Sequence, residues 1–98
     1  MSTGEIQTDV RQCISTVCCN MARFLRAKNV KYGNSALDPM KIFSKQDAES
    51  QLYNRIDDKL SRIKNSSELR KNDVVDLIGY LILLCVKNGW TNFEDLLD

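Results

Sequence analysis

The sequence predicts an all-α fold, a compact helical bundle of three main helices and a short C-terminal helix. Apolar residues recur at helical spacing over three long stretches. Only one of the 98 residues is proline and only four are glycine, which argues against a loop-rich or all-β chain. The length predicts a single domain over residues 1–98, with a core of modest size.

The first predicted helix begins near Ile6 and ends near Lys28 or Asn29. Its apolar residues follow each other at steps of three and four positions over about five turns. The stripe consists of Ile6, Val10, Cys13, Ile14, Val17, Cys18, Met21, Phe24 and Leu25. We expect residues 1–5 to be disordered, because they precede this pattern.

Residues 29–45 are predicted to be an ordered connecting loop. Gly33-Asn34-Ser35 and Asp38-Pro39 are turn signals. A loop of about seventeen residues is long for a compact domain, and such loops are often functional. We expect order because the loop contains apolar anchors, namely Tyr32, Leu37, Ile42 and Phe43.

The second helix is predicted to open at Ser44-x-x-Asp47, with Ser44 as the N-cap and Asp47 as an acid in the first turn, and to close at Asn65-Ser66-Ser67. The third helix runs from about Glu68 or Asn72 to Asn88, with Gly89 as its C-terminal capping residue. Thr91-x-x-Glu94 predicts a capping box that opens the short last helix.

The third helix is apolar on almost every side between Val74 and Val86, which is typical of a central helix. A helix of this kind is hard to cover within a domain that has only about three other helices. We therefore expect a homo-oligomer, a dimer or a larger closed assembly.

The net charge of +1 conceals a basic middle section. Residues 23–45 carry six lysines and arginines against Asp38 alone, a local net charge of +5. Such a section favours an anionic partner, although a solvated face is the alternative. The overall charge is too small for general binding of nucleic acids.

The chain has four cysteines and no histidine, and its cysteine spacing argues against a zinc site. Free cysteines suit the reduced cytosol, and no signal peptide is visible in the polar residues 1–12. The longest apolar run, Leu77–Val86, is far shorter than the ~20 residues of a membrane span. We therefore expect a cytoplasmic protein with no membrane partner.

Two predicted helices carry residues suited to a phosphorylated ligand. Asp73, Asp76 and Tyr80 share one face of the third helix, where two carboxylates one turn apart can hold Mg²⁺. The second helix has three cations on one flank, which suit a phosphate group. These cations are Arg55, Lys59 and Arg62, with Asp58 beside them.

Ordinary helix stabilisation is the alternative explanation for these charges. Asp58 can pair with Arg62 or Arg55 along its own helix. Asp73 and Asp76 can simply complement the helix dipole. Asp76, however, enters an apolar run and needs a partner, because an isolated buried charge is costly. Lys59, Arg62 or a metal ion could be that partner.

The segment Lys31-Tyr32-Gly33-Asn34-Ser35 is a second candidate for a nucleotide contact. Lys31 offers a positive charge, Tyr32 a face for stacking and Asn34 a polar contact. The alternative is a turn with one buried tyrosine. Trp90 and Phe93 are expected in a core or an interface.

The order of these motifs resembles a group of small phage-encoded helical proteins over residues 25–86. It is also remotely similar to the MazG-like all-α nucleoside triphosphate pyrophosphatases. Those enzymes bind Mg²⁺ through an E-x-x-E and an E-x-x-D motif on successive helices. Asp73-x-x-Asp76 matches the second motif with one change, while Asp58 amid cations stands where the first is expected.

These observations lead to one functional hypothesis and two alternatives. We expect a phage-type protein that sequesters a cyclic or ADP-ribose-type nucleotide signal of host anti-phage defence without cleaving it. No cofactor is then needed. A Mg²⁺-dependent pyrophosphohydrolase is the first alternative, with Asp58, Asp73 and Asp76 as metal ligands. A protein-binding phage inhibitor is the second.

Overall fold

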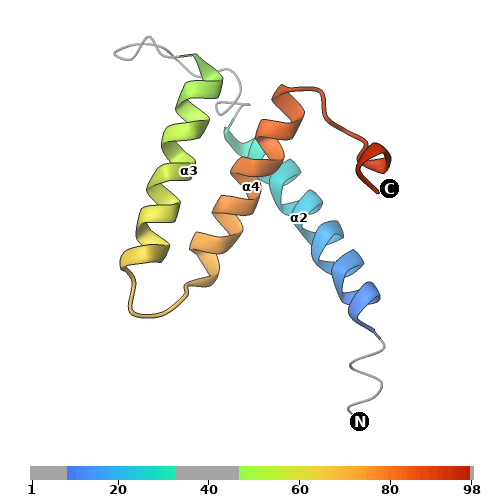
Figure 1. Ribbon diagram of the computed structural model, residues 1–98, viewed down its shortest axis with the longest axis horizontal. Coiled ribbons are helices and arrows are strands. Elements are labelled where there is room, and N and C mark those ends of the chain that lie inside the picture. Colours follow the sequence, from blue (N-terminus) through green and yellow to red (C-terminus); the bar gives the residue numbers. More distant parts are fainter. Residues whose placement is uncertain (1–8, 33–46, 98) are drawn as a thin grey trace. The chain divides into compact units, whose positions relative to one another are not determined.

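The computed structural model describes residues 9–32 and 47–97, and every regular element in these ranges is helical. The elements are α2 (Val10–Tyr32), α3 (Ala48–Asn65), α4 (Lys71–Lys87) and a short 3-10 helix, η1 (Glu94–Leu96) (Figure 1). This confirms the all-α prediction, while the bundle and its assembly stay predictions. The chain divides into two compact units, Met1–Tyr32 and Gly33–Asp98.

Within the described part of the first unit, residues 9–32, the helix is α2, which is 23 residues long. It continues to Tyr32, so the prediction that residues 29–32 belong to the loop is wrong. Lys28 and Asn29 do not stop a helix, since neither has the backbone restrictions of proline. The predicted disorder of residues 1–5, the start at Ile6 and the rest of the loop lie outside the described residues.

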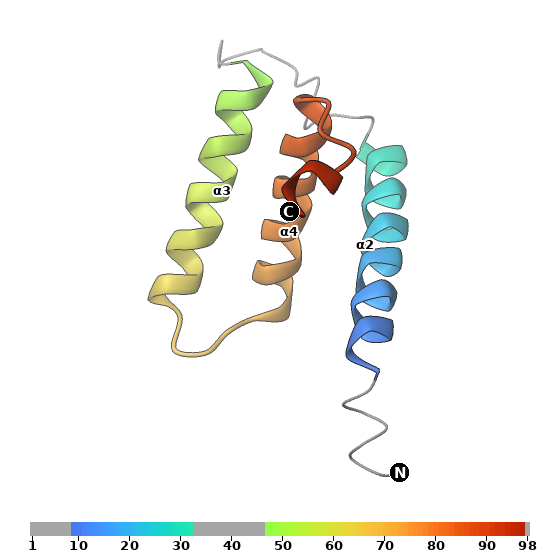
Figure 2. The same cartoon turned by 45° about the vertical axis from the view of Figure 1, so that its right-hand side comes forward.

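The second unit is built on an antiparallel hairpin of α3 and α4, which lie side by side (Figures 1 and 2). Asp47 is the N-cap of α3, and its side chain accepts a hydrogen bond of 2.8 Å from the Ser50 amide. The prediction that Asp47 lies in the first turn after an N-cap at Ser44 is therefore wrong, because aspartate is itself a strong N-cap residue. Helix α3 ends at Asn65, as predicted. Leu52 of α3 is almost fully buried and lies on the helix face that also carries Lys59.

Helix α4 ends in a Schellman motif at Gly89. The Gly89 amide donates to the Val86 carbonyl at 3.1 Å, and the Trp90 amide donates to the Cys85 carbonyl at 2.9 Å. Gly89 has φ 73°, a left-handed conformation that glycine adopts without steric cost. The prediction of Gly89 as the capping residue is therefore confirmed.

The C-terminal element is shorter than the predicted helix. The Asn92 side chain accepts a hydrogen bond of 2.9 Å from the Glu94 amide. Only one 3-10 turn follows, and no side chain caps it at its first flanking residue, Phe93. The predicted capping box at Thr91 is thus replaced by a local Asn92 turn, because asparagine readily bonds its own backbone two residues on.

Among the described helices, none has the combination of length and apolar character that is needed to cross a membrane.

Candidate functional site

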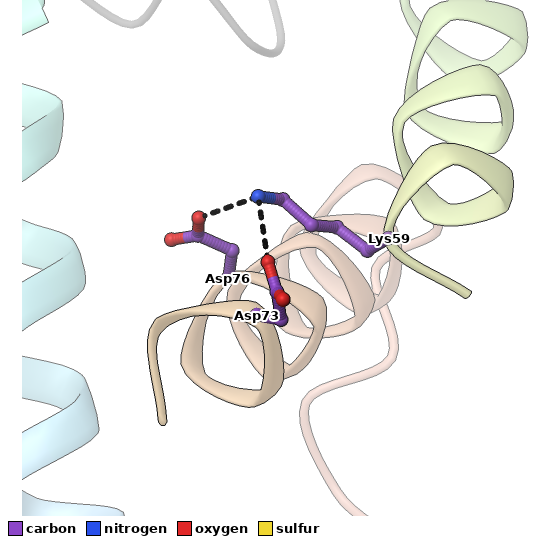
Figure 3. A network of polar contacts seen from close by, with 3 residues as sticks. All are labelled: Lys59, Asp73 and Asp76. Atoms are coloured by element: carbon purple, nitrogen blue, oxygen red, sulfur yellow. Dashed lines mark ion pairs between the residues drawn. The ribbon is translucent and has the colours of Figure 1, made fainter. Parts of the chain in front are cut away.

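The polar centre of the hairpin is an ion-pair cluster that joins α3 to α4 (Figure 3). The Lys59 Nζ atom lies 3.0 Å from Asp76 Oδ2 and 3.6 Å from Asp73 Oδ1. Asp73 and Asp76 stand one turn apart on α4, so both carboxylates can reach the same point. One ammonium group on α3 therefore bridges two carboxylates on α4.

This cluster is largely shielded from water. The exposed fraction of the side chain is 11% for Lys59, 4% for Asp73 and 23% for Asp76. Charges at such positions persist only when they are paired, because desolvation is costly. The prediction that Asp76 needs a partner is confirmed, and the partner on α3 is Lys59.

The acids of α4 also hold Lys59 in its charged form. The hydrogen bond to Asp76 raises the pKa of the Lys59 ammonium above its ordinary value, and the negative charges of Asp76 and Asp73 act in the same direction. Burial and the positive charge of Arg62 oppose this increase of the pKa without reversing it. Lys59 is therefore a fixed cation and not a nucleophilic amine at neutral pH.

A second contact between the helices lies one turn away. The guanidinium carbon of Arg55 lies 5.9 Å from the centre of the Tyr80 ring, which is a cation–π arrangement. Arg55 precedes Lys59 by one turn of α3, and Tyr80 follows Asp76 by one turn of α4. In an antiparallel hairpin these steps run in the same direction, so the two contacts are neighbours. Arg55 and Tyr80 are both partly exposed.

Two other predicted site residues on α3, Asp58 and Arg62, are exposed. Asp58 forms no ion pair with Arg55 or Arg62 in the part of the chain that the structure describes. Nor does that part bring three or more acidic or thiol side chains together in a metal-binding arrangement. The metal set Asp58, Asp73 and Asp76 stays a prediction.

The remaining predicted contacts are Lys31, Tyr32 and Asn34, at and just after the end of α2 in the sequence. Lys31 lies in the last turn of α2, where its side chain is exposed. Tyr32 is the last residue of α2, and its side chain is not among those described. Asn34 lies outside the described residues. The role of these three residues as nucleotide contacts stays a prediction.

The sequence placed Arg55, Lys59, Asp73, Asp76 and Tyr80 among the candidates. It named Lys59 as one of three possible partners of Asp76, but it did not pair Arg55 with Tyr80. The missing information was the register of the hairpin, which decides which turn of α3 faces which turn of α4. One signal in the sequence could have indicated polar contacts between the helices. Arg55 and Lys59 stand at helical spacing from the apolar residues Leu52 and Ile56, so they share a face with them.

Comparison of the chain with protein-family models, with curated proteins and with solved structures gave no match.

Proposed function

We propose that the Arg55–Tyr80 and Lys59–Asp73–Asp76 contacts form a site that binds a small phosphorylated nucleotide and does not cleave it. The observation that carries the proposal is the cation–π pair beside a buried ion-pair cluster. A guanidinium group can bind phosphate through two hydrogen bonds, and a tyrosine ring can stack on a base. The carboxylates of α4 can accept hydrogen bonds from ribose hydroxyl groups or base amino groups.

The position of Lys59 favours binding over hydrolysis. Metal-assisted hydrolysis of a phosphate bond needs carboxylates that are available to a divalent cation. In this hairpin a tethered ammonium lies between the two carboxylates at 3.0 Å and 3.6 Å. It supplies the positive charge that a metal ion would otherwise supply, but it cannot activate a water molecule in the way that a metal ion does.

The proposed ligand is a cyclic or ADP-ribose-type nucleotide signal. Its sequestration would make the chain a phage-type, homo-oligomeric antagonist of host defence in the cytoplasm. The support for this part comes from the sequence pattern and its resemblance to small phage-encoded proteins. The basic section of residues 23–45, with a net charge of +5, would add to the attraction of such an anion.

Equilibrium dialysis of wild type and variants against ATP, ADP-ribose and a cyclic dinucleotide tests the site. Arg55→Ala and Tyr80→Leu should each weaken binding of the preferred compound on the order of tenfold or more. Tyr80→Phe should retain most of the affinity, because it keeps the aromatic face. Lys64→Ala, which removes an exposed cation of α3, is the matched control. Equal affinity of all five proteins would refute the site.

The pyrophosphohydrolase alternative is favoured by one observation. The oxygens of Asp73 and Asp76 converge on a common point, the Lys59 Nζ atom. If a ligand phosphate drew Lys59 away, the two carboxylates could hold Mg²⁺ together. This alternative predicts Mg²⁺-dependent release of a nucleoside monophosphate that Asp76→Asn abolishes. Turnover in Asp76→Asn at the wild-type rate would exclude these carboxylates as the metal ligands.

A further inference from the structure

Helix α4 has a second apolar face, opposite the one that meets α3. Helical spacing places Asp73 and Tyr80 on the α3 side. The opposite arc begins with Lys71 at the first residue of α4 and continues with apolar residues and a cysteine, namely Val74, Val75, Ile78, Leu81, Ile82, Cys85 and Val86. Leu81, Ile82 and Val86 are exposed. A continuous exposed apolar face is typical of an interaction surface.

Opposite charges flank the two ends of this face. At the hairpin turn, Lys64, Arg70 and Lys71 are exposed cations, with Glu68 as the acid among them. The other end of α4 has one exposed cation, Lys87 in the last turn, and the chain then continues into residues 88–97, which contain Glu94 and Asp95 and no lysine or arginine. Figures 1 and 2 show the hairpin turn and the start of this segment at opposite ends of α4.

The C-terminal segment also exposes large apolar side chains. More than half of the surface is exposed in each of Trp90, Phe93, Leu96 and Leu97. The sequence allowed Trp90 and Phe93 in a core or an interface, and their exposure is consistent with an interface. The segment therefore combines acidic groups with apolar anchors, which would fit a basic and apolar surface.

We propose that a second copy of this chain packs its α4 antiparallel against the exposed face of α4. A two-fold axis near the middle of the helix would use the same surface of both copies, which closes the assembly as a dimer. The acidic segment of each copy then lies at the basic hairpin turn of the other. A parallel arrangement would place cations against cations and acids against acids, which is unfavourable.

The proposed function includes a homo-oligomer, and this interface describes how two copies would meet. The inference rests on the proposed homo-oligomeric state and on no other part of the proposed function. It does not require a nucleotide. Nucleotide binding is measured separately, by dialysis of the wild-type protein. A dimer that binds no nucleotide would refute the proposed ligand and leave the interface intact. A monomer that binds nucleotide would refute the interface and leave the proposed ligand intact.

Sedimentation equilibrium of the full chain tests the surface first. The wild type should have twice the 11.2 kDa mass of the chain at micromolar concentration. Leu81→Asp should shift the dimer to a monomer, because it buries a charge in the interface. Leu60→Asp is the matched control, since Leu60 is a comparably exposed leucine on α3. Circular dichroism should show the same helix content in all three proteins.

Charge reversal then tests the orientation. Arg70→Glu/Lys71→Glu and Glu94→Lys/Asp95→Lys should each weaken the dimer on the order of tenfold, since each creates like-charge contacts. The two pairs of substitutions together should restore the wild-type dissociation constant. Arg23→Glu/Arg26→Glu on α2 makes the same change in net charge as the first pair, and it should leave the dimer intact.

Three outcomes would overturn the proposal. A wild-type protein that is monomeric throughout the micromolar range has no such interface. A dimer that persists in Leu81→Asp does not use this face of α4. The third outcome concerns the orientation. If Leu81→Asp dissociates the dimer, but the two charge-reversal pairs together do not restore the wild-type dissociation constant, the copies are not arranged antiparallel.

Discussion

The Lys59 Nζ atom of α3 lies 3.0 Å from the Asp76 Oδ2 atom of α4. This contact fixes the register of the two helices. A shift of one turn would move Lys59 away from Asp76 and would also move Arg55 away from Tyr80. The ion pair and the proposed ligand contacts therefore depend on the same register of α3 and α4.

Replacement of Lys59 by methionine should destabilise the protein. Methionine keeps most of the apolar length of lysine, but it leaves the Asp73 carboxylate without the ammonium group beside it, at a side-chain exposure of 4%. The expected loss is about 1–3 kcal/mol in the free energy of unfolding by urea. Lys64→Met, at an exposed position of the last turn of α3, should change this free energy by less than about 0.5 kcal/mol. Equal effects of the two substitutions would show that the cluster contributes nothing to stability.

The contribution of Lys59 to stability should disappear at high pH. The hydrogen bond to Asp76 raises the pKa of Lys59 in the folded state above the value of about 10.4 expected in the unfolded chain. Between these two pKa values the folded state binds more protons, so the free energy of unfolding falls as the pH rises. The contribution is fully present below the lower pKa.

Urea unfolding at several pH values from neutral to strongly alkaline measures this effect. Tyrosine and cysteine groups also titrate in this range, so the relevant quantity is the difference between wild type and Lys59→Met. That difference should be constant up to about pH 10 and then shrink. A difference that stays constant through the alkaline range would contradict the raised pKa.

The Schellman motif predicts a backbone effect at Gly89. With φ 73° and no atom within 4 Å of an added Cβ, alanine at this position meets strain in the backbone but no clash. Gly89→Ala should therefore cost about 1–2 kcal/mol in the free energy of unfolding. Gly89→Asn should cost less, since asparagine tolerates the left-handed region. Thermal unfolding of the three proteins checks the order, and an alanine variant as stable as wild type would contradict it.

Local sequence patterns predicted most of the hairpin. The polar turn at Asn65-Ser66 and the glycine at position 89 are direct backbone signals, and both lie at the ends of helices as expected. The charge of Asp76 in an apolar run correctly predicted a partner, because its burial without one would be costly. Each of these inferences depends on residues close together in the chain.

The errors arose where two local signals competed or where none was strong. Nothing between Lys28 and Tyr32 stops a helix, so α2 continues beyond the predicted end. At the C-terminus, Asn92 and Thr91 could each cap the next element, and the shorter Asn92 turn forms. The pairing of Arg55 with Tyr80 depends on the register of the hairpin, which the spacing within each helix does not determine.

Incubation with nucleotides in Mg²⁺ tests the central claim most directly. The purified protein is mixed with nucleoside triphosphates, ADP-ribose-type and cyclic nucleotides, and then separated from the filtrate. Chromatography compares the filtrate with the material that heat releases from the protein. The account predicts that one compound is depleted from the filtrate and recovered intact on heating. An unchanged set of compounds, or a monophosphate product in the filtrate, would contradict it.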